Sequence, residues 1–212
     1  MVFLPFLAWG VGVKKAVPYL TMLLLVSNIS RAYFSRREID WKLVRYLSIG
    51  AIPGAAVGAY FYTWLSAALV ARILGVYLLI YITLNFTRQT WPKSAPLRSF
   101  IPIGALMGFV SAVVGGAGPV VVPWMLRYGL IKEAFIGTEA VGATIAHVVK
   151  LIVWGSVGTI KKDDVVLLLP LTVLMVLGSY FGKLLIKRMN VRVFRAAMMV
   201  VLGAIGIRFL FY

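Results

Sequence analysis

The 212-residue sequence contains no cysteine and only one histidine. Without cysteine there are no disulfides, thiolate metal ligands or thiol nucleophiles. A single histidine also excludes the multi-histidine clusters of membrane di-iron enzymes. No Walker A motif is present, so this chain does not itself use ATP, and neither a nucleophile–base pair nor a set of metal ligands is visible. The sequence therefore argues against an enzyme and predicts no cofactor and no metal site.

Acidic residues are also scarce, with 6 Asp and Glu against 22 Lys and Arg and a net charge of +16. In a soluble protein this excess would suggest nucleic-acid binding. Here the basic residues gather in short connectors between apolar runs, which is the positive-inside pattern. The chain is 62% hydrophobic, and runs such as 165–185 reach the roughly 20 residues that cross a bilayer. We therefore predict a multi-pass protein of the cell membrane, surrounded by lipid, with no nucleic-acid partner.

The predicted fold is an all-α polytopic membrane protein built from apolar segments joined by polar connectors. The segments are 2–13, 16–34, 43–65, 68–86, 99–126, 136–154, 165–185 and 193–211. The connectors are 14–15, 35–42, 87–98, 127–135, 155–164 and 186–192. The longest connector divides the chain nearly in half, which gives one transmembrane domain over 1–212 with halves at 1–86 and 99–212.

The two halves resemble repeats, as is common in transporters. In each half an aspartate is followed by glycines 14 and 18 residues later: Asp40, Gly54 and Gly58, then Asp164, Gly178 and Gly182. In each half a proline also precedes a lysine by nine residues: Pro5 and Lys14, then Pro123 and Lys132. The second half has 24 residues before its proline and the first half has four, so we expect repeat one to be incomplete at its N-terminal side.

Glycines recur every four residues in the segment 43–65, at Gly50, Gly54 and Gly58. Gly178 and Gly182 repeat the second half of this pattern. Small residues at this spacing let helix backbones approach closely in a membrane. We therefore assign these glycines to helix packing and not to chemistry.

The segment 99–126 is apolar, yet it carries Gly115, Gly116, Gly118, Pro119 and Pro123. Glycine costs about 1 kcal/mol and proline about 3 kcal/mol inside a helix. The pattern predicts a half-helix ending near Val114, a glycine turn, and a second half-helix from about Pro119. Its first amides would form a small positive pole for an anion. The alternative is a merely kinked helix whose glycines serve packing.

Charge indicates whether this segment crosses the membrane. If it crosses, Lys and Arg divide 8 to 7 between the two sides, which is no bias. If it enters and returns, connectors 35–42, 87–98, 127–135 and 186–192 share one side with 11 basic residues, against 4 on the other. The positive-inside rule therefore favours a re-entrant segment with the first group of connectors in the cytoplasm. Each repeat then crosses three times, so the two repeats are inverted.

Three stretches of the sequence resemble the sulfite exporter TauE/SafE family over nearly the whole chain. They are "GALMGFVSAVVGGAGPVVVPWML" (104–126), "AFIGTEAVGATIAHVVKLIVWGSVGTI" (134–160) and "REIDWKLVRYLSIGAIPGAAVGAYF" (37–61). The pattern is a glycine-rich stretch, a proline, and a Gly-Thr entering the next helix, here Gly137 and Thr138. The first copy of the glycine-rich stretch is absent. The resemblance implies a transporter of sulfite, sulfonates or related organosulfur anions.

Ionisable side chains inside the membrane are expensive and are candidates for function. Glu139, His147 and Lys150 lie on one apolar helix, with His147 about 80° and Lys150 about 20° around the axis from Glu139. Arg31 follows Pro5, and Lys150 follows Pro123, at nearly the same spacing. Ser27 and Asn28 lie one turn before Arg31. Alternatively, Arg31 and Lys150 reach to headgroups, His147 packs, and Glu139 neutralises Lys132 or sits in the first turn of its helix.

These observations predict a secondary transporter of small oxoanions. The candidate substrate-binding residues are Gly115, Gly116, Gly118, Pro119, Thr138, His147, Lys150, Ser27, Asn28 and Arg31. His147 and Glu139 are the candidates for proton coupling, since the pKa of histidine lies near neutrality. A small anion and the bilayer are the expected partners, and a second copy of the chain is a further candidate. The competing hypothesis is a membrane subunit that assembles or docks a partner without transporting, which predicts no buried cationic cavity.

Overall fold

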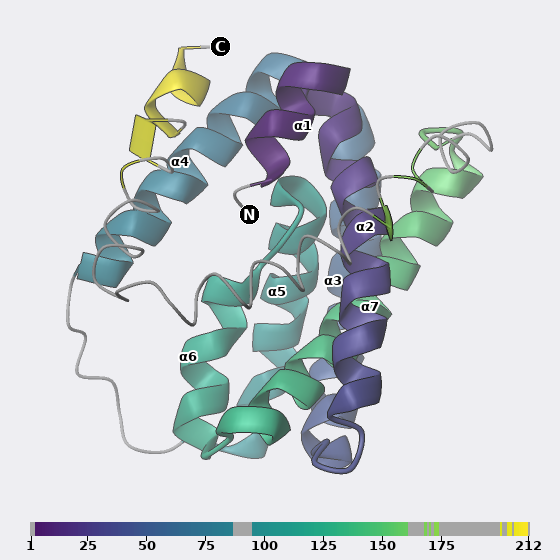
Figure 1. The fold of residues 1–212 in the computed structure, drawn as a ribbon, viewed down its shortest axis with the longest axis vertical. Coiled ribbons are helices and arrows are strands. Elements are labelled where there is room, and N and C mark those ends of the chain that lie inside the picture. The colour runs from purple at the N-terminus through teal and green to yellow at the C-terminus, as the bar shows by residue number, and fades with distance from the viewer. Residues whose placement is uncertain are drawn as a thin grey trace.

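The computed structural model describes residues 3–86 and 95–160 and, toward the C-terminus, residues 168, 170, 172, 173, 200, 203, 204 and 206–211. Every regular element among these residues is helical (Figure 1). The all-α prediction is therefore confirmed for the part of the chain that the structure describes.

The helices follow the predicted apolar segments closely in the first three quarters of the chain. They are α1 (Phe3–Val11), α2 (Val13–Phe34), α3 (Trp41–Trp64), α4 (Ala67–Phe86), the 3-10 helix η1 (Leu97–Ser99), α5 (Phe100–Val114), α6 (Gly118–Tyr128) and α7 (Lys132–Ser156). The predicted segments at 165–185 and 193–211 are described only in part. Asp164, Gly178, Gly182 and the connector 186–192 lie outside the described residues.

The broken segment forms a helical hairpin. α5 ends at Val114, as predicted, and Gly115 caps it with a left-handed φ of 80°, a conformation that glycine adopts without a steric penalty. α6 begins at Gly118 and ends at Tyr128. The ring of Tyr128 lies 5.6 Å from the ring of Phe100, the first residue of α5, so α6 returns to the end where α5 started. The kinked-helix alternative is therefore wrong, and the segment folds back on itself. The prediction that it enters and leaves the membrane on one side stays a prediction.

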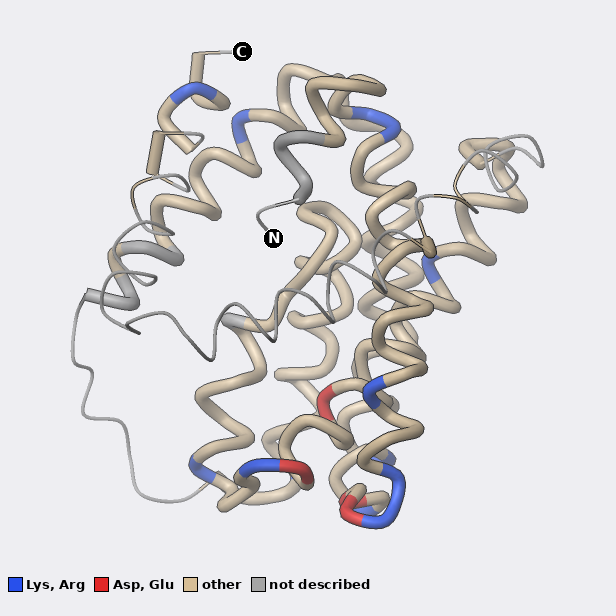
Figure 2. The backbone as a smooth tube through the Cα atoms, in the orientation of Figure 1, with Lys and Arg blue, Asp and Glu red and all other residues tan. Residues whose placement is uncertain are grey.

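Three of the four connectors that the charge count grouped together lie at one end of the helices, in so far as the structure describes them. Thr138, near the start of α7, accepts a hydrogen bond of 3.0 Å from the backbone N–H of Asp40, which brings 35–42 to the start of α7. The contact between Phe100 and Tyr128 brings together the residues that flank the hairpin. We call this the connector end. Figure 2 shows most of the described charges gathered there, in the lower part of the view.

The centre of the fold is a close contact between α3 and α5. A Cβ atom added to Gly50 would lie 1.8 Å from the carbonyl oxygen of Ile101, and one added to Gly54 would lie 2.1 Å from that of Ala105. Neither residue could carry a side chain without separating the helices. The predicted packing role of the glycines in 43–65 is therefore confirmed. Gly178 and Gly182 lie outside the described residues.

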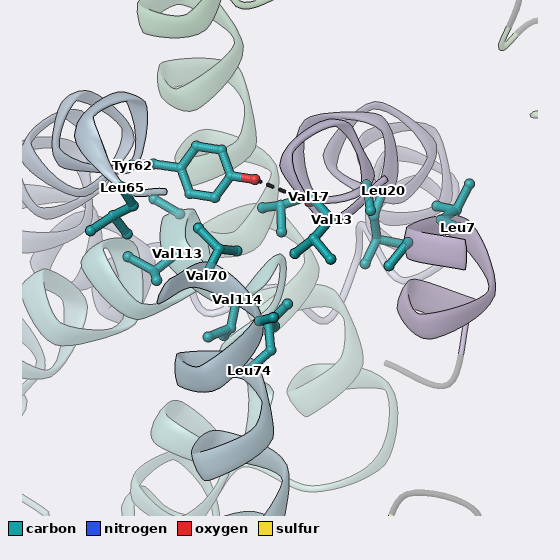
Figure 3. Packing of buried hydrophobic residues seen from close by; sticks show 14 of the residues in the cluster. Leu7, Val13, Val17, Leu20, Tyr62, Leu65, Val70, Leu74, Val113 and Val114 are labelled. Atoms are coloured by element: carbon teal, nitrogen blue, oxygen red, sulfur yellow. Dashed lines mark hydrogen bonds between the residues drawn. The ribbon is translucent and has the colours of Figure 1, made fainter. Parts of the chain in front are cut away.

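The end opposite the connectors joins α2, α3 and α7. The ammonium group of Lys14 donates to the last carbonyls of α3, those of Tyr62, Thr63 and Leu65, where the helix dipole favours a cation. Tyr62 returns a hydrogen bond of 2.9 Å to the carbonyl of Lys14. Figure 3 shows this hydroxyl directed at α2 among the buried residues around it.

The ring of Tyr62 also lies 5.4 Å from the ring of Trp154, near the end of α7. The start of α2 therefore lies near the end of α7. The opposite ends of these helices meet as well, through Arg31 and Glu139. α2 and α7 are the first long helices after the prolines of the two predicted repeats, and they run antiparallel, as inverted repeats require.

Two described helices have the length and composition to cross a bilayer, one over Leu97–Val114 and the other over Lys132–Ser156. The first contains α5, the arm of the hairpin that precedes the glycine turn. A shorter apolar helix covers Ala67–Ile80, in α4. The Gly206 carbonyl lies beside α4, 2.7 Å from where a Cβ on Gly75 would stand, so the last described residues pack along this helix (Figure 1).

Candidate functional site

The turn of the hairpin lies inside the protein. Gly115 and Ala117 are buried, and Val113 and Val114 before them belong to the apolar core. The carbonyl of Gly116 accepts a hydrogen bond of 3.2 Å from the Tyr77 hydroxyl, which satisfies one backbone group that the break leaves outside a helix. The turn therefore lies inside the protein, as predicted. Backbone groups outside a helix need hydrogen-bond partners at this depth, and the surrounding protein can supply them.

Gly118 and Pro119 begin α6. No side chain caps this helix N-terminus, so no side chain competes for the first amides of the helix. A Cβ added to Gly118 would meet no atom of the described residues within 4 Å. Among these residues, Gly118 is therefore not a packing glycine like those of α3.

Lys150 is fully buried in α7 and points into the bundle. Its Nζ donates a hydrogen bond of 3.1 Å to the carbonyl of Ser111, in the last turn of α5, and lies 6.0 Å from the centroid of the Trp154 ring. The negative end of a helix dipole is a favourable place for a cation. Among the described residues no carboxylate lies within ion-pair distance of this nitrogen. The alternative that Lys150 reaches to headgroups is therefore wrong.

His147 lies one turn before Lys150 on α7 and is 3% exposed. Its Nδ1 atom is buried and has no hydrogen-bond partner among the described residues. A buried polar atom without a partner costs about 1–3 kcal/mol. The imidazole is therefore not held in place as a satisfied core histidine would be.

Arg31 and Glu139 form an ion pair between α2 and α7. An Nη2 atom of Arg31 lies 2.5 Å from Oε2 of Glu139 and also donates to the side chain of Asn28, at 2.7 Å. Asn28 is buried, Glu139 is largely shielded and Arg31 is about half exposed. Glu139 therefore pairs with Arg31, 108 positions away in the sequence, and not with Lys132. Ser27 lies beside Asn28 and is half-buried.

Thr138 is fully buried and binds backbone. Its hydroxyl oxygen accepts from the N–H of Asp40, whose own carboxylate caps α3 by accepting from the N–H of Leu43 at 2.9 Å. This contact fixes connector 35–42 against α7. The predicted role of Thr138 in binding substrate stays a prediction.

The structure divides the predicted site residues into two groups. The glycine turn and Lys150 meet at the end of α5, with His147 one turn below Lys150. Asn28, Arg31, Thr138 and Glu139 meet at the connector end. Glu139 and Lys150 are 11 residues apart on α7, which separates the two groups by about 16 Å along the helix axis.

A surface hollow of about 400 Å³ opens at the connector end. Its lining comes from the end of α2, the following turn and the start of α7: Tyr33, Phe34, Ser35, Arg36, Arg37, Glu38 and Glu133. None of these is a predicted site residue. The guanidinium of Arg36 stacks 4.4 Å from the centroid of the Tyr33 ring, which holds one cation at the edge of the hollow.

The sequence analysis missed two features, one beside Lys150 and one in the packing of α5. Trp154, one turn further along α7, is fully buried and donates 3.0 Å to the carbonyl of Ala59, which fixes the ring beside the lysine. Gly104 and Gly108 pack α5 against Leu47 and Ala51 of α3. Their spacing of four residues is visible in the sequence and could have indicated close helix packing.

Comparison with known proteins agrees with this arrangement. A family model described as Sulfite exporter TauE/SafE matches residues 1–209. No curated protein matches the chain, and no solved structure does. The match covers the hairpin, the glycine packing and the buried lysine together, and the chain therefore belongs to the sulfite exporter TauE/SafE family of membrane transporters.

Proposed function

We propose that this protein is a secondary transporter of small oxoanions in the cell membrane, with sulfite, sulfonates or related organosulfur anions as substrates. The observation that carries the proposal is Lys150, a fully buried amine whose described partner is the Ser111 carbonyl and not a carboxylate. Burying a cation without a counter-ion costs several kcal/mol. Such a cost is typical of residues that serve substrate or ion pathways in membrane proteins.

The broken helix supports the same substrate class. Its turn begins four residues beyond Ser111, so the end of α5, the start of α6 and the amine of Lys150 lie in one region. Uncapped amides at the start of α6 suit an anion, and the lysine adds a positive charge. Half-helices that end inside the protein form substrate sites in other transporters.

His147 is the proposed proton carrier. It lies one turn from Lys150, is buried, and has an Nδ1 atom that no described residue binds. A side chain that changes charge near neutral pH suits coupling of an anion to a proton. Glu139 is the second candidate, although its ion pair with Arg31 would have to open before its carboxylate could carry a proton.

A flux assay tests the proposal. Purified protein in proteoliposomes should move sulfite down its gradient at a rate well above that of protein-free vesicles, and an imposed pH gradient should change the rate. Sulfate, methanesulfonate and chloride serve as competing anions that define selectivity. A protein that moves none of these anions would contradict the proposal and favour the docking subunit.

A further inference from the structure

The hollow at the connector end is lined by exposed side chains of both charges. Arg36, Arg37 and Glu38 follow α2, and Glu133 comes from the first turn of α7. Within the part of the chain that the structure describes, none of these four side chains forms an ion pair. The hollow therefore presents two guanidinium groups and two carboxylates that are open to a ligand carrying both charges.

Close packing fixes the two sides of the hollow against each other. A Cβ added to Gly137 would lie 2.9 Å from the Cβ of Ser35 and 3.0 Å from its carbonyl oxygen, so a larger residue there would push α7 away from the turn. Glu133 lies one turn before Gly137 and is thereby brought beside the turn. The N–H of Glu38 donates a hydrogen bond of 3.1 Å to the carbonyl of Ser35. The charged side chains therefore extend from a fixed backbone.

Aromatic rings lie at the edge of the hollow. The guanidinium of Arg36 lies 4.4 Å from the centroid of the Tyr33 ring, which is a cation–π distance. The Tyr33 ring in turn lies 5.8 Å from the Phe34 ring, and both rings are exposed at the end of α2. Exposed aromatic side chains are typical of the bilayer surface, which is where the connector end is expected to lie.

An exposed apolar stripe leads from the hollow along α2. Val26, Ile29 and Tyr33 are exposed in the described structure, and their spacing of three and four residues places them on one face of the helix. The stripe extends about 10 Å along the helix axis. It offers the acyl chain of a lipid an apolar path that ends at a charged site.

We propose that the hollow binds the headgroup of phosphatidylethanolamine, in which a phosphate and an ammonium group carry opposite charges. Arg36 and Arg37 bind the phosphate, since guanidinium groups match the geometry of phosphate oxygens. Glu38 and Glu133 accept hydrogen bonds from the ammonium group, and an acyl chain lies along the stripe of α2. The hollow of about 400 Å³ has the size of a small-molecule site, roughly 300–1,000 Å³.

The two carboxylates distinguish this lipid from other phospholipids. A headgroup with a negative charge alone would leave Glu38 and Glu133 beside a like charge. A choline headgroup carries three methyl groups on its nitrogen, so it has no N–H to donate to a carboxylate. The inference concerns the lipid around the protein and does not depend on which anion is transported.

Lipid binding to the full chain in detergent tests the site. Phosphatidylethanolamine, phosphatidylcholine and phosphatidylglycerol with identical acyl chains are titrated, and the rise in unfolding temperature gives the apparent affinity of each. Glycerophosphoethanolamine, the same headgroup without acyl chains, separates a lipid site from a site for a free zwitterion. The variants are Arg36→Gln and Glu133→Gln. Arg45→Gln is the matched control, because Arg45 is an exposed arginine of α3 that does not line the hollow.

We expect the wild type to bind phosphatidylethanolamine more tightly than the other two lipids and more tightly than glycerophosphoethanolamine. Arg36→Gln should weaken binding of phosphatidylethanolamine about fivefold, the upper end for an exposed charge pair. Glu133→Gln should remove the preference over phosphatidylcholine, and Arg45→Gln should bind as the wild type does.

Three results would overturn the site: equal or tighter binding of phosphatidylcholine or phosphatidylglycerol by the wild type, unchanged lipid affinities in both variants, or an equal loss of affinity in Arg45→Gln. Glycerophosphoethanolamine that binds as tightly as the lipid would overturn the assignment to a lipid and leave a free zwitterion as the ligand.

Discussion

The Nζ atom of Lys150 lies 3.1 Å from the carbonyl oxygen of Ser111, which joins the middle of α7 to the last turn of α5. This contact relates the buried cation to the break in the hairpin, since α5 ends three residues after Ser111. A substrate anion that replaced the carbonyl as the partner of Lys150 would find the start of α6 nearby. The predictions below concern this contact and the scaffold that holds it.

Replacing Lys150 with methionine should abolish anion flux. Methionine has a similar length and no charge, so the buried space stays filled while the cation is lost. We expect flux to fall at least about a hundredfold, as for loss of a buried charged contact, with unfolding temperature equal to or above that of the wild type. A variant that still transports at a rate near that of the wild type would remove Lys150 from the site.

Replacing His147 with glutamine should change how flux depends on pH. Glutamine is polar and of similar size but does not titrate in this range, whereas an imidazole does. We expect the wild-type flux to change with pH and the variant to show a flatter profile over the same pH interval. Identical profiles would assign proton coupling to another residue, and Glu139→Gln is then the variant to measure.

Single cysteines should reveal the topology, because the natural chain contains none. Thr90→Cys and Ile131→Cys, on either side of the hairpin, should react with an impermeant maleimide from the same side of the membrane, the cytoplasm. Val157→Cys, at the opposite end of α7, should react from the other side. Labelling of positions 90 and 131 from opposite sides would contradict a hairpin that enters and returns.

Replacing Gly54 with leucine should unfold the contact between α3 and α5. The added Cβ would stand 2.1 Å from the Ala105 carbonyl oxygen, and backbone on both sides prevents a local adjustment. We expect a loss of about 3 kcal/mol or more, measured as a lower unfolding temperature or a failure to purify in folded form. Gly155→Leu is the control, because a Cβ added there would meet no atom of the described residues within 4 Å. A stable Gly54→Leu protein with altered selectivity would place this glycine in the site.

Exchanging the charges of Arg31 and Glu139 should separate electrostatic from steric effects at the connector end. The single variants Arg31→Glu and Glu139→Arg each place two like charges together and should destabilise the protein by about 1 kcal/mol, since Arg31 is about half exposed. The double variant should recover most of that loss in unfolding temperature. Single variants as stable as the wild type would show that the pair contributes nothing to the fold.

Much of the architecture was determined by the sequence alone because its causes are local. The break after Val114 follows from glycine and proline, whose backbone costs act within a few residues. The return of the hairpin followed from counting basic residues in connectors. The packing role of Gly50, Gly54 and Gly58 followed from a four-residue spacing on one helix. The cost of a charge in lipid favoured an inward position of Lys150, but the sequence left open that it reaches to headgroups.

Only the tertiary structure decided which groups meet. Sequence placed Glu139, His147 and Lys150 on one face of one helix, but the structure pairs Glu139 with Arg31 and leaves Lys150 on the carbonyl of Ser111. It assigned the Thr138 hydroxyl to the backbone of Asp40. These relationships depend on the rotation and register of one helix against another, which are set by close packing over the whole interface, such as that of the glycines of α3 and α5. No local pattern in the chain encodes them.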